Sequence, residues 1–329
     1  TYSTDDNYTT YQNPYELGII YTVDGAIQQL NLDQYTNAFD RLNAIVTAML
    51  GEEETVKLFR PVDTENYTSY YDNLEISYRA GHICYFPIDE ELSGKLTYEF
   101  DLPQGGPVYA QYVTDYASNC SLSINDEDWG SILESGRQIL SLGIREAGEH
   151  IKFEISTTDE SKRIVFKETD KYFFVLDTEL LQQIMPLLQA GAADITDWDS
   201  THITASFNNG GDEQLLFTSI PYDTGWQVKI DGQAVQTVKT LDALIAVDLS
   251  DVAQGTHEIT FSYFPKIYFV GIAASLLGLT LFILILLLDR RRKKAGGCRK
   301  HWKTSSQNGA DTPAQISAAQ DGGEKEDDI

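Results

Sequence analysis

The longest apolar run in the sequence lies near its C-terminal end, from Ile267 to Leu288. It contains 22 residues without a charge, between Lys266 and Asp289. A helix of this length reaches about 33 Å, enough to cross a hydrocarbon core of about 30 Å. Buried core helices rarely stay apolar on every face for so long. The run therefore predicts one transmembrane helix over residues 267–288.

Before this run, the alternation of apolar and polar positions predicts a chain built mainly from β-strands. Lys95–Leu102 and Ile151–Ser156 alternate strictly, which is typical of strands with one buried face. Several shorter candidates follow the same pattern and are separated by turn residues. Many short strands at this spacing predict an antiparallel, extracytoplasmic β-sandwich of jelly-roll type over residues 55–168.

Residues 169–266 predict a small, membrane-proximal α+β domain. Tyr172–Leu176 reads as its first strand, and Thr178 can cap a following helix that Pro186 kinks or shortens. Further strands follow, and the last of them ends directly before the membrane helix.

The clearest hairpin of this region joins Trp226–Ile230 to Ala234–Val238 through Asp231-Gly232. Asp-Gly suits a two-residue turn in which both central residues need positive φ. Trp226, Val228 and Ile230 are expected to share the buried face.

The polar residues 1–54 read as a connector that carries an amphipathic helix over residues 33–50, ended by Gly51. Apolar residues recur there at steps of three and four. This face consists of Tyr35, Phe39, Leu42, Val46 and Met49. We expect it to pack on a sheet or on a membrane-embedded part of the protein.

Charge adds an orientation to this picture. Residues 1–266 carry 15 Lys and Arg but 43 Asp and Glu, whereas five basic residues follow the apolar run at 290–294. The positive-inside rule then places residues 1–266 outside the membrane and the tail in the cytoplasm. So acidic an exterior also excludes nucleic acid as a partner.

The two ends of the chain complete the predicted organisation. Residues 289–329 form a basic tail with few apolar residues, which predicts disorder. The chain begins at Thr1 without a basic and apolar leader. We expect either that a signal peptide has been removed or that membrane spans of the same polypeptide lie upstream.

Cysteine and motif searches give few candidates for chemistry. Cys84 and Cys120 either form one disulfide or remain free thiols. No Cys and His cluster has the spacing of a zinc site, and no cofactor motif is present, so no metal is expected. The histidines are scattered, and His257 reads as a structural hydrogen-bonding residue rather than a base.

Two weak binding patterns remain. Asp126 and Asp128 lie in an acidic turn that could bind Ca²⁺, although a solvated turn fits its spacing better. Aromatic residues could stack on sugar rings or could fill the sandwich core. These candidates for glycan contact are Tyr109, Tyr112, Tyr116 and Trp129.

A set of turn and aromatic residues lies at the end of the β-rich region, directly before the apolar run. They are Pro221, Tyr222, Gly225, Trp226, Asp231, Gly232, His257, Tyr263 and Pro265. This set resembles the C-terminal end of YfhO-family bacterial membrane proteins, and residues 37–51 resemble a segment of that family's extracytoplasmic region. The matching positions look structural, with turns at Gly225 and Asp231-Gly232.

This resemblance implies a multi-spanning protein similar to GT-C glycosyltransferases. Such enzymes move a sugar from a polyprenyl-phosphate donor to an envelope polymer, for example lipoteichoic acid. Their acidic catalytic residue lies near the first spans, so no catalytic residue is expected in this chain. Its expected role is to cover the active site or bind the acceptor glycan. The alternative is a single-span surface protein whose ectodomain binds a glycan or a protein without catalysis.

Overall fold

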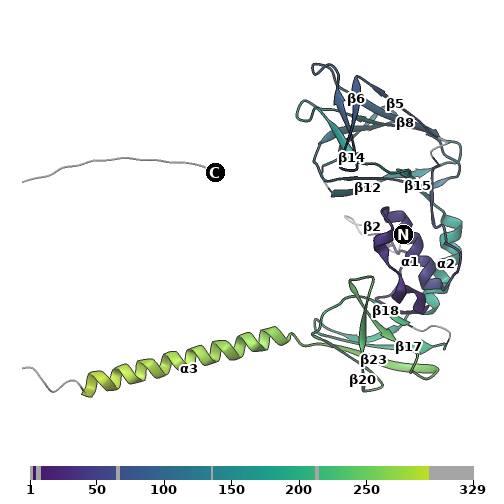
Figure 1. Ribbon diagram of the computed structural model, residues 1–329. Helices are drawn as coiled ribbons and strands as arrows, with labels where there is room; N and C mark the ends of the chain where they lie inside the picture. Colours follow the sequence, from purple (N-terminus) through teal and green to yellow (C-terminus); the bar gives the residue numbers. More distant parts are fainter. Residues whose placement is uncertain (1–2, 5–8, 64–66, 135, 212–214, 296–329) are drawn as a thin grey trace, which may run out of the picture. The chain divides into compact units, whose positions relative to one another are not determined.

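The computed structural model describes residues 3–4, 9–63, 67–134, 136–211 and 215–295. The chain forms two compact units, Thr1–Pro265 and Lys266–Ile329. In Figure 1 the first unit consists of sheets with short helices, and the second contains one long helix. The fold is mainly antiparallel β, as predicted. The predicted boundaries at residues 54/55 and 168/169 fall inside the first unit and stay predictions.

The first group of strands forms a sandwich of three antiparallel sheets. Their strand orders are β11-β10-β13-β8-β5, β12-β9-β15-β4 and β14-β7-β6. The strands are β4 (Phe59–Pro61), β5 (Tyr67–Asp72), β6 (Leu74–Arg79), β7 (His82–Pro87), β8 (Lys95–Asp101), β9 (Gly106–Thr114), β10 (Cys120–Ile124), β11 (Glu127–Ile132), β12 (Gly136–Arg145), β13 (His150–Ser156), β14 (Ile164–Lys167) and β15 (Phe173–Leu176).

Alternating side chains fill this sandwich. In β13, Ile151, Phe153 and Ile155 are fully buried, while the residues between them are partly exposed. Phe153 packs against Phe173 from the opposite sheet, with 5.2 Å between ring centroids. Each large apolar side chain buried in this way contributes about 1.5–3 kcal/mol. The period-2 pattern therefore identified the strands that carry the core.

Strand β15 pairs with other strands than the sequence suggested. It pairs with β9 and β4, so it belongs to the sandwich and not to the sheets that follow. Phe173, Phe174 and Val175 are all buried, because helix α1 (Ala38–Leu50) covers the other face of this sheet. A strand buried on both faces shows no alternation that would reveal its sheet.

The second group of strands forms two further antiparallel sheets around a core of their own. Their strand orders are β16-β17-β23-β19-β20 and β21-β22-β18-β3. The strands are β3 (Ile20–Val23), β16 (Asp194–Trp198), β17 (His202–Asn209), β18 (Leu215–Pro221), β19 (Trp226–Ile230), β20 (Gln233–Val235), β21 (Thr237–Thr240), β22 (Leu244–Asp248) and β23 (Gly255–Tyr263). A separate two-stranded sheet pairs β1 (Ser3–Thr4) with β2 (Thr9–Thr10).

Two expectations for these sheets need correction. Residues 20–23, expected to be connector, form β3 and pair with β18. Both faces of β3 are buried, so its sequence lacks the expected alternation. Residues 234–238, expected as one strand, divide between β20 and β21 in different sheets. The hairpin across Asp231-Gly232 is confirmed, with φ of 49° and 79° at the two turn residues.

Helix α1 begins at Ala38 rather than at residue 33. The Asn37 Oδ1 accepts a hydrogen bond from the Phe39 N–H at 2.8 Å and caps the helix. The preceding residues form the 3-10 helices η1 (Gly25–Gln29) and η2 (Leu32–Gln34). The helix packs on a sheet, one of the two expected places, and Gly51 ends it at a φ of 67°.

The second helix, α2 (Thr178–Ala190), begins at Thr178, the residue predicted to cap it, and its actual cap lies one residue earlier. Asp177 is the N-cap, and its Oδ1 accepts a hydrogen bond from the Leu180 N–H at 2.9 Å. The helix continues through Pro186. Pro186 has no N–H, so the carbonyl of Gln182 loses its usual hydrogen-bond partner. Both residues are exposed, so water can satisfy that carbonyl.

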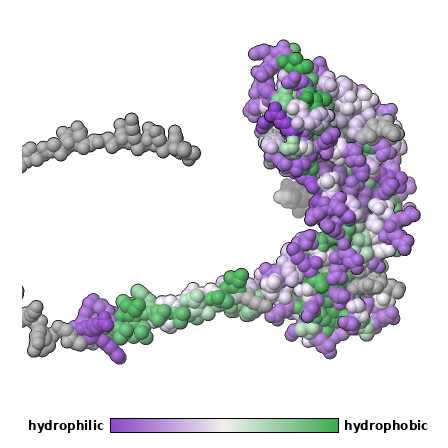
Figure 2. All heavy atoms as spheres, in the orientation of Figure 1, coloured by the Kyte–Doolittle hydropathy of each residue, from purple (hydrophilic) through white to green (hydrophobic). Residues whose placement is uncertain are grey.

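The third helix, α3, spans Lys266–Ala295. Within it, Ile267–Lys293 has the length that suits a membrane span, and an 18-residue window of this segment has a mean hydropathy of 2.7. Figure 2 shows apolar residues along most of its length and hydrophilic residues at its C-terminal end. The helix continues past the predicted end at residue 288, so residues 289–295 correct the prediction of a disordered tail. Residues 296–329 lie outside the described residues.

Candidate functional site

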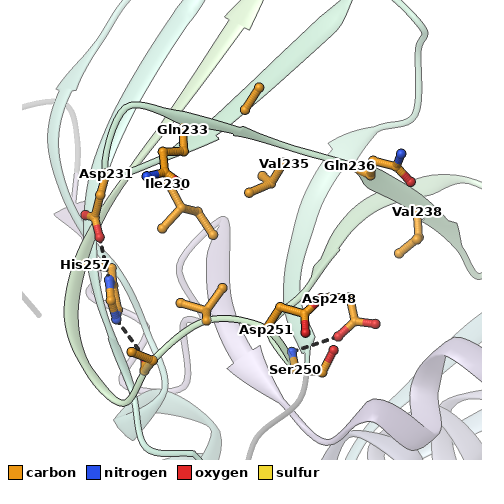
Figure 3. Close-up of a pocket in the computed structure, with 13 residues that line it drawn as sticks. Ile230, Asp231, Gln233, Val235, Gln236, Val238, Asp248, Ser250, Asp251 and His257 are labelled. Atoms are coloured by element: carbon orange, nitrogen blue, oxygen red, sulfur yellow. Dashed lines mark hydrogen bonds and ion pairs between the residues drawn. The ribbon is translucent and has the colours of Figure 1, made fainter.

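A polar cleft of about 630 Å³ lies between the two sheets of the second group of strands (Figure 3). It is lined by three carboxylates, two amides, a serine and a histidine. These are Asp231, Asp248, Asp251, Gln233, Gln236, Ser250 and His257. Apolar side chains, among them Val235 and Val252, line the same space. We call this space the Asp231 cleft.

Asp231 is held by the hairpin turn that it helps to form. Its Oδ1 accepts a hydrogen bond from the Glu258 N–H at 3.0 Å, and its Oδ2 lies 2.7 Å from the His257 Nδ1. One side chain thus ties the β19–β20 turn to the start of β23. Both hydrogen bonds lower the pKa of Asp231, and the one from His257 has the larger effect.

His257 uses both ring nitrogens on acceptors. Its Nδ1 faces the Asp231 carboxylate, and its Nε2 lies 2.8 Å from the Ala253 carbonyl oxygen. Neither acceptor has a proton to give, so the geometry favours the doubly protonated imidazolium. The hydrogen bond with Asp231 is the main cause that raises the pKa of His257. A ring held in this way orients the cleft wall and is not poised as a general base.

The opposite wall of the cleft is a turn after β22. The Asp248 Oδ1 accepts a hydrogen bond from the Ser250 N–H at 2.8 Å, which lowers the pKa of Asp248. Figure 3 shows Asp248, Ser250 and Asp251 on one side and Asp231 and His257 on the other. Carboxylates and amides around an open space can accept and donate hydrogen bonds to several hydroxyl groups. The arrangement therefore suits a polyhydroxylated ligand.

The family-like residues near the end of β23 form a packed corner. The Gly225 N–H donates to the Asp223 Oδ1 at 2.6 Å, and the Phe264 N–H donates to the Gly225 carbonyl at 2.9 Å. A Cβ at Gly225 would lie 2.8 Å from the Tyr263 Cε2, so only glycine fits without movement. The rings of Trp226 and Tyr263 lie 5.0 Å apart.

The remaining family-like positions lie beside this corner. Pro221 ends β18, and the Tyr222 N–H donates to the Ala243 carbonyl at 2.8 Å. Pro265 is the last residue before α3. These positions fix turns and strand ends, whereas Asp231 and His257 also line the cleft.

The aromatic candidates for glycan contact do not come together. Tyr112 is only 1% exposed and stacks on Phe153 and Tyr172, so it fills the sandwich core. Tyr109 packs against Phe39 of α1. Tyr116 and Trp129 are exposed, but neither lines the Asp231 cleft.

Asp126 lies in the turn between β10 and β11, and Asp128 lies in β11 just after it. Asp126 pairs with the Lys152 Nζ at 2.7 Å, and the Asp128 Oδ1 accepts the Gly130 N–H at 2.9 Å. Within the described residues, no group of three His, Cys, Asp or Glu side chains could hold a metal ion.

The two cysteines of the sandwich are free and buried, which decides between the two alternatives left by the sequence. Burial raises the pKa of the Cys120 thiol to about 12, so this thiol stays protonated. The pair therefore contributes packing and no cross-link.

Sequence reasoning identified Asp231 and His257 but missed the rest of the cleft. Gln233 and Gln236 lie in or next to β20, and Asp248 and Asp251 lie at or after the end of β22. These strands belong to different sheets, and no motif links the four residues. The only local signal is a cluster of turn residues, Ser250-Asp251, a few positions before Gly255. Such clusters predict loops and not ligands.

Similarity to solved structures is low. One match is a conserved protein of unknown function from Pseudomonas aeruginosa PAO1, with 8% identity and a TM-score of 0.15. The match covers 63% of this chain and 93% of that protein. Another match is a β-glucuronidase from Ruminococcus gnavus, with 8% identity and a TM-score of 0.20. The match covers 62% of this chain and 40% of that enzyme. TM-scores this low support no inference about fold or function.

Similarity at the level of sequence is informative. The "Uncharacterized protein YfhO" of Bacillus subtilis (strain 168) is 22% identical over 303 residues, which is 88% of this chain. The chain spans 33% of the length of that relative. The family model described as "Bacterial membrane protein YfhO" matches residues 1–275. The chain therefore belongs to the YfhO family of bacterial membrane proteins.

Proposed function

We propose that this chain is the C-terminal extracytoplasmic region and last membrane span of a GT-C-like glycosyltransferase. The whole protein transfers a sugar from a polyprenyl-phosphate carrier to a cell-envelope polymer, such as lipoteichoic acid. The β-rich unit binds the acceptor in the Asp231 cleft, and catalysis belongs to other spans of the same polypeptide.

The polar cleft is the observation that carries this proposal. Its carboxylates, amides and hydroxyl surround about 630 Å³, a volume that accommodates one or two sugar units. Two of its residues, Asp231 and His257, belong to the family-like positions, and the unit that contains it directly precedes α3 in the sequence. Basic residues after the apolar run support the proposed orientation.

The test is sugar transfer by the full-length protein in its own membrane. Asp251→Asn keeps the size of a cleft side chain but removes an acceptor charge. Such hydrogen bonds to a charged group contribute about 1.5–3 kcal/mol, so we expect sugar incorporation into the envelope polymer to fall at least tenfold at limiting acceptor. Asp197→Asn changes an exposed carboxylate of β16 outside the cleft and serves as the control.

Two results would contradict the proposal. One is unchanged sugar incorporation in Asp251→Asn. The other is that the full-length protein incorporates no sugar into any envelope polymer, although the folded β-rich unit still binds a glycan.

The second outcome would favour the alternative, a surface protein that binds a glycan or protein without catalysis. One observation supports that alternative. Thr1–Pro265 is compact on its own and contains its own cores, so binding would not require other membrane spans.

A further inference from the structure

A second pocket lies where α1 meets the sandwich, and its polar groups are mainly cationic or hydrogen-bond donors. It encloses about 340 Å³ at the N-terminal end of the helix. Arg41 reaches it from α1, Arg137 from β12, Lys167 from β14 and Gln111 from β9. Two exposed carboxylates, Asp33 and Glu168, also line it.

The two arginines are not neutralised by the protein. Within the described residues, neither Arg41 nor Arg137 has a carboxylate partner within 4.0 Å, although Asp33 and Glu168 line the same pocket. Arg41 donates from Nε to the Tyr35 carbonyl at 2.8 Å, which leaves the ends of its guanidinium free. Unpaired neighbouring arginines are unexpected in a chain with 50 acidic and 24 basic residues. An external anion would remove the repulsion between them.

Gln111 adds a free hydrogen-bond donor to the same pocket. Its side chain is only 3% exposed, and its Oε1 accepts a hydrogen bond from the Ala38 N–H at 2.8 Å. Gln111 lines the pocket, and its amide nitrogen has no hydrogen-bond partner among the described residues. This nitrogen is not one of the fully buried side-chain atoms that lack a partner, so it is accessible and can donate to a ligand.

The positions of these groups are fixed by the fold. Gln111 and Asn37 each hold one N–H of the first turn of α1, at Ala38 and Phe39. The positive end of the helix dipole therefore lies beside the pocket. Lys167 is anchored by Asp115, 3.1 Å away, and the backbone of Arg137 pairs with Val113 of β9. Donors thus approach one volume from four elements.

We propose that this pocket binds the phosphate group of an anionic ligand. A tetrahedral phosphate can accept hydrogen bonds from two guanidinium groups, the Gln111 amide and Lys167 at the same time, whereas a planar carboxylate is satisfied by a single arginine. The volume also admits part of the group to which the phosphate is esterified. The phosphate ester comes either from a soluble molecule or polymer or from a lipid headgroup. This proposal does not depend on glycosyl transfer.

The test measures binding to the full chain in detergent by titration calorimetry. Inorganic phosphate and glycerol 3-phosphate are the soluble probes, acetate is the planar competitor, and phosphatidylglycerol vesicles present a lipid headgroup to the reconstituted protein. We expect phosphate and glycerol 3-phosphate to bind at least tenfold more tightly than acetate. Stronger binding of the vesicles than of glycerol 3-phosphate would identify the lipid as the source, and the reverse would identify a soluble ester.

Three substitutions separate the site from general electrostatics. Arg137→Gln should weaken phosphate binding at least tenfold. Gln111→Glu keeps an acceptor for the Ala38 N–H but replaces the free amide donor by a charge, and it should abolish binding without unfolding α1. Arg79→Gln removes an exposed arginine of β6 outside the pocket and should change nothing. Phosphate binding by Arg137→Gln or Gln111→Glu at the wild-type affinity, or equal affinity for acetate, would overturn the proposal, as would no binding by the wild-type chain at millimolar phosphate.

Discussion

At the scale of single residues, the Asp231–His257 pair connects family-like sequence to the cleft. The carboxylate satisfies the Glu258 N–H and His257 together, so it closes the hairpin and positions the cleft wall. The side chain of His257 is 13% exposed and that of Asp231 54% exposed. The pair is therefore within reach of a ligand and of solvent protons.

This pair predicts a pH-dependent contribution to stability. The pKa of His257 is raised above 6.5, so its contribution is fully present below pH 6.5 and is lost as the pH rises through the raised value. The pKa of Asp231 is lowered below 3.8, so its contribution is present above pH 3.8 and is lost as the pH falls through the lowered value. The pair should stabilise the fold most between about pH 4 and pH 6.5.

The measurement is the Tm of the wild-type chain and of His257→Gln over this range. The Tm difference should be largest near pH 5–6 and should shrink above the raised pKa of His257. His150→Gln removes an exposed histidine from the sandwich and should give a small difference, as expected of a surface ion pair. A Tm difference between wild type and His257→Gln that stays constant from pH 5 to pH 9 would show that the pair is not ionised as described.

The sequence predicted part of the candidate site at this scale. Asp231 and Gly232 follow from the preference of Asp-Gly for a tight turn, and a structural role was expected for His257. Asp248 and Asp251 could not be predicted, because strand pairing across two sheets brings them opposite Asp231. Tyr112 was a candidate for glycan contact but is buried in the core. The sequence pattern of an aromatic residue on a strand is the same whether its ring faces the core or a ligand.

At the scale of elements, Asn43 explains why the predicted face of α1 was partly wrong. Leu42 was expected to be buried but is 41% exposed, whereas Asn43 is 4% exposed. The Asn43 amide accepts from the Phe59 N–H and donates to the Phe59 carbonyl, both at 2.8 Å. A polar residue on a helix thus pairs with the free edge of β4, a role that hydrophobic periodicity cannot reveal.

Asn43→Ala should therefore destabilise the fold more than Leu42→Ala. The substitution leaves a partly buried N–H and C=O of Phe59 without partners, at a cost of about 2–4 kcal/mol. Leu42→Ala, on the exposed side of the same helix, should cost less than about 1 kcal/mol. Denaturant unfolding of the full chain, followed by tryptophan fluorescence, measures both free energies. Equal costs for the two variants would contradict the proposed edge pairing.

Gly225→Ala tests the packed corner at the end of β23. The new Cβ would lie 3.0 Å or less from the Tyr263 ring, the Asp223 carboxylate and the Phe264 carbonyl. We expect a loss of about 1–3 kcal/mol in the free energy of unfolding, because these neighbours must move. Gly18→Ala is the matched control, since its Cβ would have no neighbour nearer than 3.7 Å. Equal stability of the two variants would show that the corner tolerates a side chain.

At the scale of the whole molecule, the fold class was predictable and the grouping of strands was not. Alternation identified most sandwich strands, and an apolar run identified α3. Strands β3 and β15 are buried on both faces and join sheets far from their neighbours in sequence. Long-range pairing of this kind depends on the complete core and leaves no local pattern.

The arrangement across the membrane underlies the proposed function, because an acceptor polymer can reach the Asp231 cleft only outside the cell. Native cysteines allow a direct test. Cys84 and Cys120 are buried in the folded unit, whereas Cys298 lies after the basic residues that follow α3. Ser200→Cys adds an exposed thiol to the β-rich unit.

The decisive measurement is labelling of the full-length protein in cells by a membrane-impermeant maleimide. We expect the Ser200→Cys thiol to react in intact cells and Cys298 to react only after the membrane is permeabilised. Reaction of Cys298 in intact cells, with Ser200→Cys protected until permeabilisation, would place the β-rich unit in the cytoplasm and contradict the proposed function.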